Sequence, residues 1–405
     1  MIQKKQSQTE FILLMASLMS IVALSIDAIL PALESIGISI GIKDATDNQL
    51  LITMIFLGLG FGQLIFGPLS DSIGRKPVIY IGFTVFVLAS ILCVFATSIE
   101  MMVLGRILQG IGLSAPRTIS ISMVRDSFSG DYMAKIMSFI VAIFILVPVV
   151  APALGKLMLD TFGWRSIFNS QLIFGLIVMI WLWKRQPETL DPNHKIKLSK
   201  ALFINGLKEF MTFKSSVAFT LVSGLITGSF MVYLSASQEI FQNQYGLVDE
   251  FPYLFAALAI SVGFATFLNG TFVVKYGMYT MVKVFLISFT VIPIIYLLLF
   301  FGKPNPENVY ILLAFFAMQF FSIGFLFGNL RSLAMQPVGH IAGIGAAING
   351  FVSTVMAVPI ATYIGGFVKT TASPLFVGFL ICGSLSLLIL MILRSITKKS
   401  LSLAA

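Results

Sequence analysis

The sequence predicts an all-α integral membrane protein with twelve transmembrane helices. Three observations lead to this fold class. Of the 405 residues, 58% are hydrophobic and only 11% are charged, the mean hydropathy is +0.98, and twelve long apolar runs follow one another along the chain. A soluble domain of ordinary composition contains about 25% charged residues. The excess apolar surface is therefore expected to face lipid.

Each apolar run is long enough to cross about 30 Å of hydrocarbon, which takes about 20 helical residues. The first six helices are expected near residues 11–33, 50–69, 77–97, 99–124, 134–158 and 165–183. The second six are expected near residues 215–236, 251–273, 282–301, 308–330, 341–368 and 374–394. The first run resembles a secretory signal but is too long for one, and eleven further runs follow it.

Lysine and arginine are distributed unequally over the connections between these runs. If the N-terminus is inside, the inner connections and termini hold nineteen of these residues and the outer connections hold five. Because positive residues collect on the cytoplasmic side of membrane proteins, both termini are expected in the cytoplasm. The net charge of +9 is then a signal of topology, and we expect no nucleic-acid partner.

The longest connection, residues 184–214, separates an N-terminal six-helix bundle (1–183) from a C-terminal one (215–405). Part of this connection is basic and amphipathic, which is typical of helices that lie along a membrane surface. A weak repeat relates the halves, because glycines seven residues apart follow both the second and the eighth run. Duplicated six-helix bundles are typical of rocking transporters with a site near the membrane midplane.

The connection after the second run reads GPLSDSIGRKP, from Gly67 to Pro77. Glycine suits a tight turn in which the backbone takes a positive φ. Asp71 is expected to accept hydrogen bonds at a helix N-terminus, and Arg75 and Lys76 are expected to anchor the inner surface. A generic basic turn would rarely show this spacing.

This connection resembles the signature of the major facilitator superfamily, G-x-x-x-D-x-x-G-R-[KR]. The matching residues are Gly67, Asp71, Gly74, Arg75 and Lys76. The resemblance implies that they gate the conformational change and do not bind substrate. It also implies that Asp126, at the inner end of the fourth run, is the partner of the arginine in this loop.

Two further runs resemble elements of the same superfamily. LGRILQGIG in the fourth run, with Arg106 and Gln109, resembles an R-x-x-Q-G element associated with proton coupling. PVVAPALG in the fifth run resembles the antiporter element in the form found in the bicyclomycin/chloramphenicol-resistance (Bcr/CflA) branch. Its Pro148 and Pro152, four residues apart and followed by Gly155, remove backbone hydrogen bonds on one helix face and permit a bend.

Other short matches to this branch cover nearly the whole chain. They are Asp27 to Pro31, Gly163 to Arg165, Pro187 to Thr189, Ser235 to Ser237 and Gly339 to Gly343. The resemblance implies proton-coupled efflux, by antiport, of small lipophilic or cationic compounds including drugs. The resemblance also implies a monomer in the bacterial inner membrane, which uses the proton gradient as its energy source and needs no bound cofactor. Its partners would be the substrate, protons and the bilayer.

Two alternatives remain open. One is a transporter of a single metabolite, such as a siderophore exporter or a proton symporter, which the direction of transport would distinguish. The other is a membrane-embedded lipid-modifying enzyme, which would need His, Asp or Cys clustered at one interface. Cys93, Cys382, His194 and His340 lie far apart in the sequence and show no metal-binding spacing.

An ionisable side chain within the hydrocarbon costs about 2.5–3.5 kcal/mol or more, so it is a functional candidate by default. Of the seventeen acids, only Asp27 falls well inside a run, and Arg106 and Arg117 do likewise. Asp27 and Arg106 are expected at similar depth, about 9 and 10 Å from the outer ends of their helices. We expect Asp27 to bind the proton and Arg106 to tune it, because burial disfavours a charged carboxylate and a guanidinium favours it. A static structural pair is the alternative.

The rest of the substrate site is less well defined by the sequence. The 38 Phe and 19 Met residues could line an adaptable apolar pocket, although most of them are expected to face lipid or neighbouring helices. The predicted polar contacts to substrate are Asp27, Gln109, Arg117, Tyr233 and Gln238.

Overall fold

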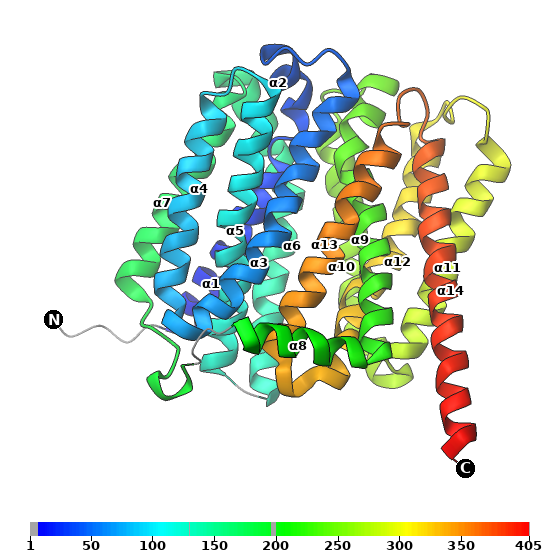
Figure 1. Ribbon diagram of the computed structural model, residues 1–405. Coiled ribbons are helices and arrows are strands. Elements are labelled where there is room, and N and C mark those ends of the chain that lie inside the picture. The colour runs from blue at the N-terminus through cyan, green and yellow to red at the C-terminus, as the bar shows by residue number, and fades with distance from the viewer. Residues whose placement is uncertain (1–6, 129, 196–199, 405) are drawn as a thin grey trace. The chain divides into compact units, whose positions relative to one another are not determined.

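The computed structural model describes residues 7–128, 130–195 and 200–404, and over these residues the chain is helical (Figure 1). The chain divides into two compact units. Unit 1 comprises Met1–Ser199 and Asp249–Ala256, and unit 2 comprises Lys200–Val248 and Ala257–Ala405. The bundle limits predicted at residues 183 and 215 stay a prediction, and residues 196–199 of the predicted connection lie outside the described residues.

Unit 1 contains six long helices. They are α1 (Gln8–Asp27), α3 (Leu50–Ile73), α4 (Arg75–Val94), α5 (Ile99–Ser127), α6 (Gly130–Phe162) and α7 (Arg165–Arg185). Its shorter elements are η1 (Leu30–Ala32), α2 (Leu33–Ser39), η2 (Ala45–Gln49) and η3 (Pro192–His194).

Unit 2 begins with a short helix and continues through long ones. They are α8 (Lys200–Thr212), α9 (Lys214–Gln238), α11 (Met278–Phe300), α12 (Val309–Met335), α13 (Ala342–Gly365) and α14 (Ser373–Ala404). The π-helical segment η4 (Glu239–Gln244) follows α9, and η5 (Gln336–Ile341) follows α12. Helix α10 (Phe251–Tyr276) begins in the residues assigned to unit 1 and continues in unit 2.

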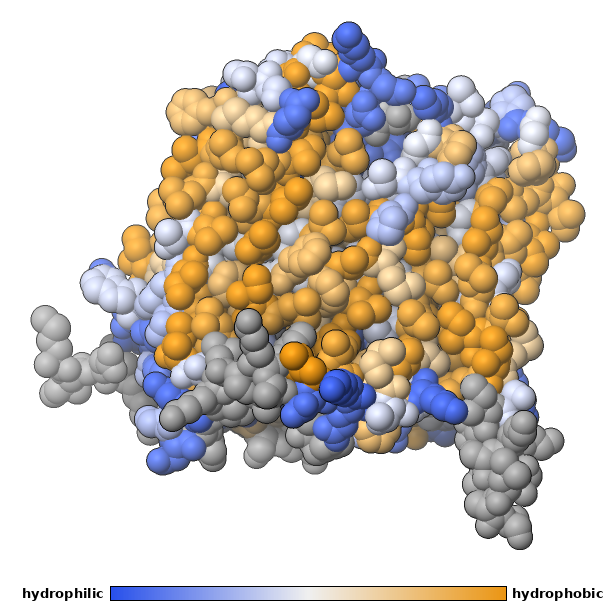
Figure 2. Space-filling view, in the orientation of Figure 1, coloured by the Kyte–Doolittle hydropathy of each residue, from blue (hydrophilic) through white to orange (hydrophobic). Residues whose placement is uncertain are grey.

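Within the described residues, ten helices are long and apolar enough to cross a membrane. Helices α5 and α6, with 29 and 33 residues, also have the necessary length. These twelve helices match the twelve predicted runs, so the predicted all-α membrane fold is confirmed. Figure 2 shows hydrophobic residues over the middle of the helices and hydrophilic residues towards their ends.

The first predicted helix, residues 11–33, is wrong at its end. Helix α1 stops at Asp27, and a turn and the 3-10 segment η1 lead into the short helix α2. In a continuous helix the carbonyl of Asp27 would accept the N–H of residue 31, but residue 31 is a proline and has none. Pro31 lies inside η1 and is buried. The chain therefore breaks its first membrane helix next to Asp27.

Small residues bring the helices of unit 1 close together, as is common in membrane proteins. A Cβ at Gly58 of α3 would collide with the backbone of Ile107, and one at Gly110 of α5 would collide with that of Ile55. At one end of α1, Glu10 accepts hydrogen bonds from Arg185 of α7 (Nε 2.6 Å, Nη2 2.7 Å). These contacts hold α3 against α5 and α1 against α7.

Helix α8 corresponds to the amphipathic part of the predicted connection. Figure 1 shows it lying across the ends of α9 and α13. Phe210 is buried against Val338 and Ile348, whereas Leu207 and Met211 are exposed. One side of α8 thus packs on unit 2 and another side leaves apolar residues uncovered, as expected of a helix at a membrane surface.

Candidate functional site

Arg75 links the ends of three helices in unit 1. Its Nε donates to Asp126 Oδ2 at 2.8 Å, and its Nη1 donates to Ser70 Oγ at 2.9 Å. The same Nη1 forms an ion pair with Asp71. The Arg75 side chain is only 3% exposed, so it is a buried cation with two carboxylate partners. These three polar partners and Arg75, which join α3, α4 and α5, are called the arginine clasp below.

Glu188 binds the backbone next to the arginine clasp. It was not identified as a functional residue from the sequence. Its two carboxylate oxygens accept the backbone N–H groups of Arg75 and Lys76, each at 3.0 Å. The first N–H groups of a helix have no partner within the helix, so Glu188 caps the N-terminus of α4. The next residue, Thr189, donates its hydroxyl to Asp126 Oδ2 at 3.2 Å. The short motif Pro187 to Thr189 was the only available signal.

The role predicted for Asp71 at a helix N-terminus is wrong. Asp71 lies two residues before the end of α3, where it faces Arg75, and the cap of α4 comes from Glu188. Gly74, between the two helices, has a φ of +115° and a Cβ there would meet Glu188, so only glycine fits. A Cβ at Gly67 would meet nothing within 4 Å, so no close contact explains this glycine.

Arg106 is buried in unit 1, and each of its three guanidinium nitrogens donates a hydrogen bond. Its Nε donates to the carbonyl of Leu51 on α3 at 2.7 Å, and its Nη2 donates to that of Ser25 on α1 at 3.0 Å. Its Nη1 donates to Gln109 Oε1 at 2.7 Å, and Gln109 in turn donates to Ser90 Oγ on α4 at 2.8 Å. Arg106 therefore ties α1, α3 and α5 together, and through Gln109 it reaches α4.

Asp27 lies at the last residue of α1 and is 5% exposed. Among the described residues, its carboxylate has no hydrogen-bond or ion-pair partner. Arg106 does not pair with it but holds the carbonyl of Ser25, two residues earlier. The structure thus places Asp27 in a buried position at a helix break, with the nearby arginine bound to the backbone of the same helix.

Helix α6 passes through both prolines of its motif without ending. Pro148 and Pro152 have no N–H, so the carbonyls of the residues four positions earlier lack their usual helical donors. A Cβ at Gly155 would collide with the carbonyl of Ala28. The motif therefore lets α6 lie directly against the broken end of α1, next to Asp27. The predicted bend of α6 stays a prediction.

The remaining substrate candidates lie apart from this cluster along the chain. Tyr233 is buried in α9 of unit 2, and its ring centroid is 4.5 Å from that of Phe320. Gln238, the last residue of α9, is buried just before the π-helical segment η4, and such segments are frequent at functional sites. Arg117 is half-buried in α5 of unit 1.

The positions of the charges indicate the class of this protein. Arg106 and Asp27 are buried within the spanning helices of unit 1, Arg106 with specific hydrogen-bond partners and Asp27 at a helix break. Helices that only anchor a protein in lipid have no need of such residues, which mark pathways for ions and solutes. Together with the two units of spanning helices, they define a multi-pass membrane transporter.

The chain belongs to the Major Facilitator Superfamily, whose family model matches residues 13–362. It is 26% identical to the bicyclomycin resistance protein homolog of Haemophilus influenzae, over 98% of this chain and 99% of that protein. It is 24% identical to the multidrug resistance protein MdtL of Klebsiella pneumoniae, over 95% of both chains. These relatives agree with the branch suggested by the sequence motifs.

Solved structures show the same fold. A crystal structure of a D-xylose-proton symporter superimposes with a TM-score of 0.72 at 16% sequence identity, over 94% of this chain and 97% of that one. This likeness concerns the fold alone. The family and the fold identify a transporter, and the alternative of a membrane-embedded enzyme is not supported.

Proposed function

We propose that this transporter exports small lipophilic or cationic compounds, drugs among them, in exchange for protons. The names of its relatives, which refer to bicyclomycin and multidrug resistance, support the substrate class. The proton gradient is an adequate energy source. One charge that moves through 100 mV releases about 2.3 kcal/mol, which sustains roughly a fifty-fold gradient of substrate.

The observation that carries this proposal is the buried carboxyl of Asp27 at the broken end of α1. Interrupted membrane helices commonly supply the ion and substrate sites of transporters. A buried carboxyl without a cation beside it is least costly in its neutral, protonated form. An approaching cationic substrate stabilises the charged form, so substrate and proton compete for Asp27.

Arg106 acts in this proposal as a positioning residue. It fixes the end of α1 through the carbonyl of Ser25, which keeps Asp27 in place without neutralising it. The proposed polar contacts to substrate are Asp27, Gln109, Arg117, Tyr233 and Gln238. Gln109 is bound to Arg106 and Ser90, so it must release one of them before it can bind a substrate.

The arginine clasp is the proposed gate of unit 1. It joins the ends of α3, α4 and α5 through a buried cation, so any rearrangement of these ends must first separate Arg75 from its carboxylates. Breaking a buried ion pair is strongly unfavourable. The clasp therefore favours one arrangement of the helix ends, as a gate requires. We further propose a monomer in the bacterial inner membrane, with both termini in the cytoplasm.

The test is transport by purified protein in vesicles with an imposed pH gradient and ethidium as the lipophilic cation. The wild type is expected to move ethidium against the direction of proton flow, and a protonophore is expected to abolish this movement. Asp27→Asn is expected to abolish ethidium-induced proton movement. Glu34→Gln, which removes an exposed carboxylate from α2, is the matched control and is expected to retain it.

Other outcomes would redirect the proposal. Undiminished proton movement in Asp27→Asn would remove Asp27 from the coupling role and leave drug export intact. Ethidium that moves with the protons would indicate symport. Transport of a single metabolite such as a siderophore, with no movement of ethidium or similar cations, would replace multidrug export with a dedicated exporter.

A further inference from the structure

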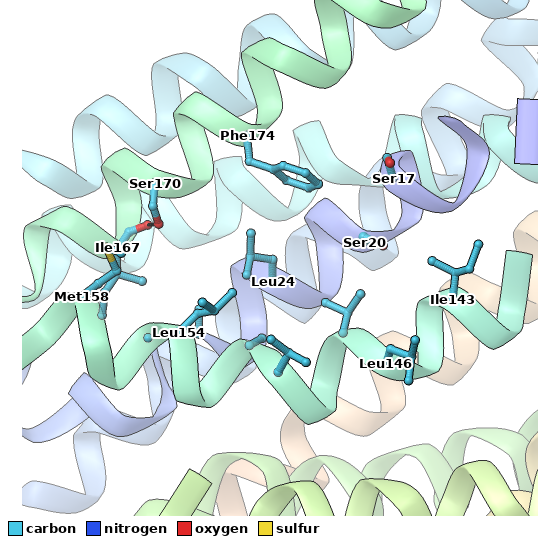
Figure 3. A pocket seen from close by; sticks show the side chains of 15 residues that line it. Ser17, Ser20, Leu24, Ile143, Leu146, Leu154, Met158, Ile167, Ser170 and Phe174 are labelled. Carbon is cyan, nitrogen blue, oxygen red and sulfur yellow. Dashed lines mark hydrogen bonds between the residues drawn. The ribbon is translucent and has the colours of Figure 1, made fainter. Parts of the chain in front are cut away.

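A groove opens on unit 1 between α6 and α7, with α1 as its floor. Its volume is about 500 Å³, which lies within the range of about 300–1,000 Å³ for small-molecule sites. Figure 3 shows Leu24 of α1, Leu154 of α6 and Phe174 of α7 directed into the space between the three helices. Of the described residues, its lining includes Gly155 but neither Asp27 nor Arg106.

The lining of the groove is suited to hydrocarbon. None of its side chains is charged, and its polar side chains are Ser17, Ser20 and Ser170. Each serine hydroxyl donates to a carbonyl of its own helix at 2.7 Å. Because these hydrogens are already used, the groove offers no free side-chain donor, and a polar ligand would lose its hydrogen bonds to water without replacement.

The length of the groove matches one leaflet of a bilayer. Its floor runs from Ser17 to Ala28, twelve residues that span about 16 Å along the helix axis. Half of the hydrocarbon core of a bilayer is about 15 Å thick. The lining residues of α7 fall in its first three turns, and those of α6 run from Ile143, near the middle of the helix, to Met158. The groove therefore lies in the leaflet where α6 ends and α7 begins.

The groove also opens sideways, away from its floor. Leu146 and Val150, two of the α6 residues along it, are 59% and 47% exposed. Both lie within a membrane-spanning helix, so their uncovered sides are apolar surface at membrane depth. A flexible hydrocarbon chain can enter such a groove from the side, whereas a folded protein segment would need partners for its backbone.

We propose that this groove binds one hydrocarbon chain of a bilayer lipid. The hydrocarbon chain of the lipid fills the space beside the contact of Gly155 with Ala28. It thereby supports the packing of α6 on the broken end of α1. The polar headgroup takes no part in recognition, because no charged side chain lines the groove. This inference does not rest on the proposed export function.

Native mass spectrometry of the purified protein tests the proposal. The wild type, released from phosphatidylcholine nanodiscs with mild detergent, is expected to retain one lipid per protein. Ser17→Phe and Ser170→Phe fill the groove from α1 and α7, and each is expected to lower the lipid-bound fraction at least tenfold. Ile177→Phe, at a position of α7 that is 57% exposed and outside the lining, is the matched control and is expected to keep the lipid.

Substitution of phosphatidylglycerol with the same chains is expected to leave the lipid-bound fraction unchanged. A strong preference for either headgroup would overturn the proposal, as would full retention of lipid by both filled variants or its loss from Ile177→Phe. Displacement of the lipid by ethidium would instead assign the groove to substrate. Thermal unfolding of each variant, with Ser17→Leu as a milder substitution, separates loss of the site from loss of the fold.

Discussion

At the scale of single residues, Arg106 is a buried charge whose hydrogen bonds join neighbouring helices. Its guanidinium reaches carbonyls on two other helices and an amide on its own helix. The ammonium group of a lysine carries all its N–H donors on one nitrogen, so it cannot reach the three separate acceptors of Arg106 at once. We expect Arg106→Lys to lower the unfolding temperature of the purified protein, because a hydrogen bond from a charged group contributes about 1.5–3 kcal/mol and lysine cannot make all three.

Arg165→Lys is the matched control for this substitution. Arg165 also donates to a backbone carbonyl, that of Val94 at 3.0 Å, but it is exposed at the start of α7, where water can replace the lost donor. Its unfolding temperature is expected to stay close to that of the wild type. Equal losses in the two variants would show that the buried network around Arg106 contributes little.

At the scale of helices, the contact between α6 and α1 depends on the absence of one side chain. A Cβ at Gly155 would overlap the carbonyl of Ala28, so Gly155→Ala must push α6 away from α1. Overpacking of this kind costs about 1–3 kcal/mol. We expect Gly155→Ala to unfold at a lower temperature and to lose proton-coupled ethidium transport, because Asp27 lies next to this contact.

Gly67→Ala provides the comparison. Gly67 lies inside α3 with open space around it, and alanine favours a helix interior by about 1 kcal/mol over glycine. Its thermal stability is expected to equal or slightly exceed that of the wild type. A destabilised Gly67→Ala would mean that the space beside this glycine is filled in the folded protein.

The cap of α4 by Glu188 gives a second prediction at this scale. Its carboxylate accepts the N–H groups of Arg75 and Lys76, and loss of such a cap costs about 0.5–2 kcal/mol. We expect Glu188→Ala to lower thermal stability and Glu188→Gln to have a smaller effect, because an amide oxygen can still accept one bond. Asp191→Ala, which removes the cap of the three-residue segment η3, is expected to change stability little.

At the scale of the whole molecule, the sequence was sufficient for the fold because lipid imposes simple requirements. A helix that crosses hydrocarbon needs about 20 apolar residues, and this pattern is local in the chain. The end of α1 was missed because hydropathy continues past Asp27 while backbone hydrogen bonding does not. Pro31 alone does not predict the break, because α6 continues through Pro148 and Pro152.

The candidate site was less predictable because its contacts join distant parts of the chain. The resemblance suggested Asp126 as a partner of Arg75, 51 residues away, and the structure brings the two together. The cap by Glu188 connects residues 113 positions apart, and no local pattern encodes it. Likewise, the similar depth of Asp27 and Arg106 was expected to bring them together, yet the arginine is bound to backbone carbonyls that no side-chain pattern reveals.

Topology is the prediction that belongs to the molecule as a whole. The distribution of Lys and Arg, nineteen against five, predicts that the loop at Gly163 is outside and that the turn at Gly277 is inside. Alkaline phosphatase, which is active only outside the cytoplasm, is therefore expected to be active when fused after Gly163 and inactive when fused after Gly277. A green fluorescent protein fused to the C-terminus is expected to fluoresce. Both glycines have positive φ in turns between long helices, so the two fusion points are structurally matched, and the reverse pattern of activity would invert the orientation of every helix.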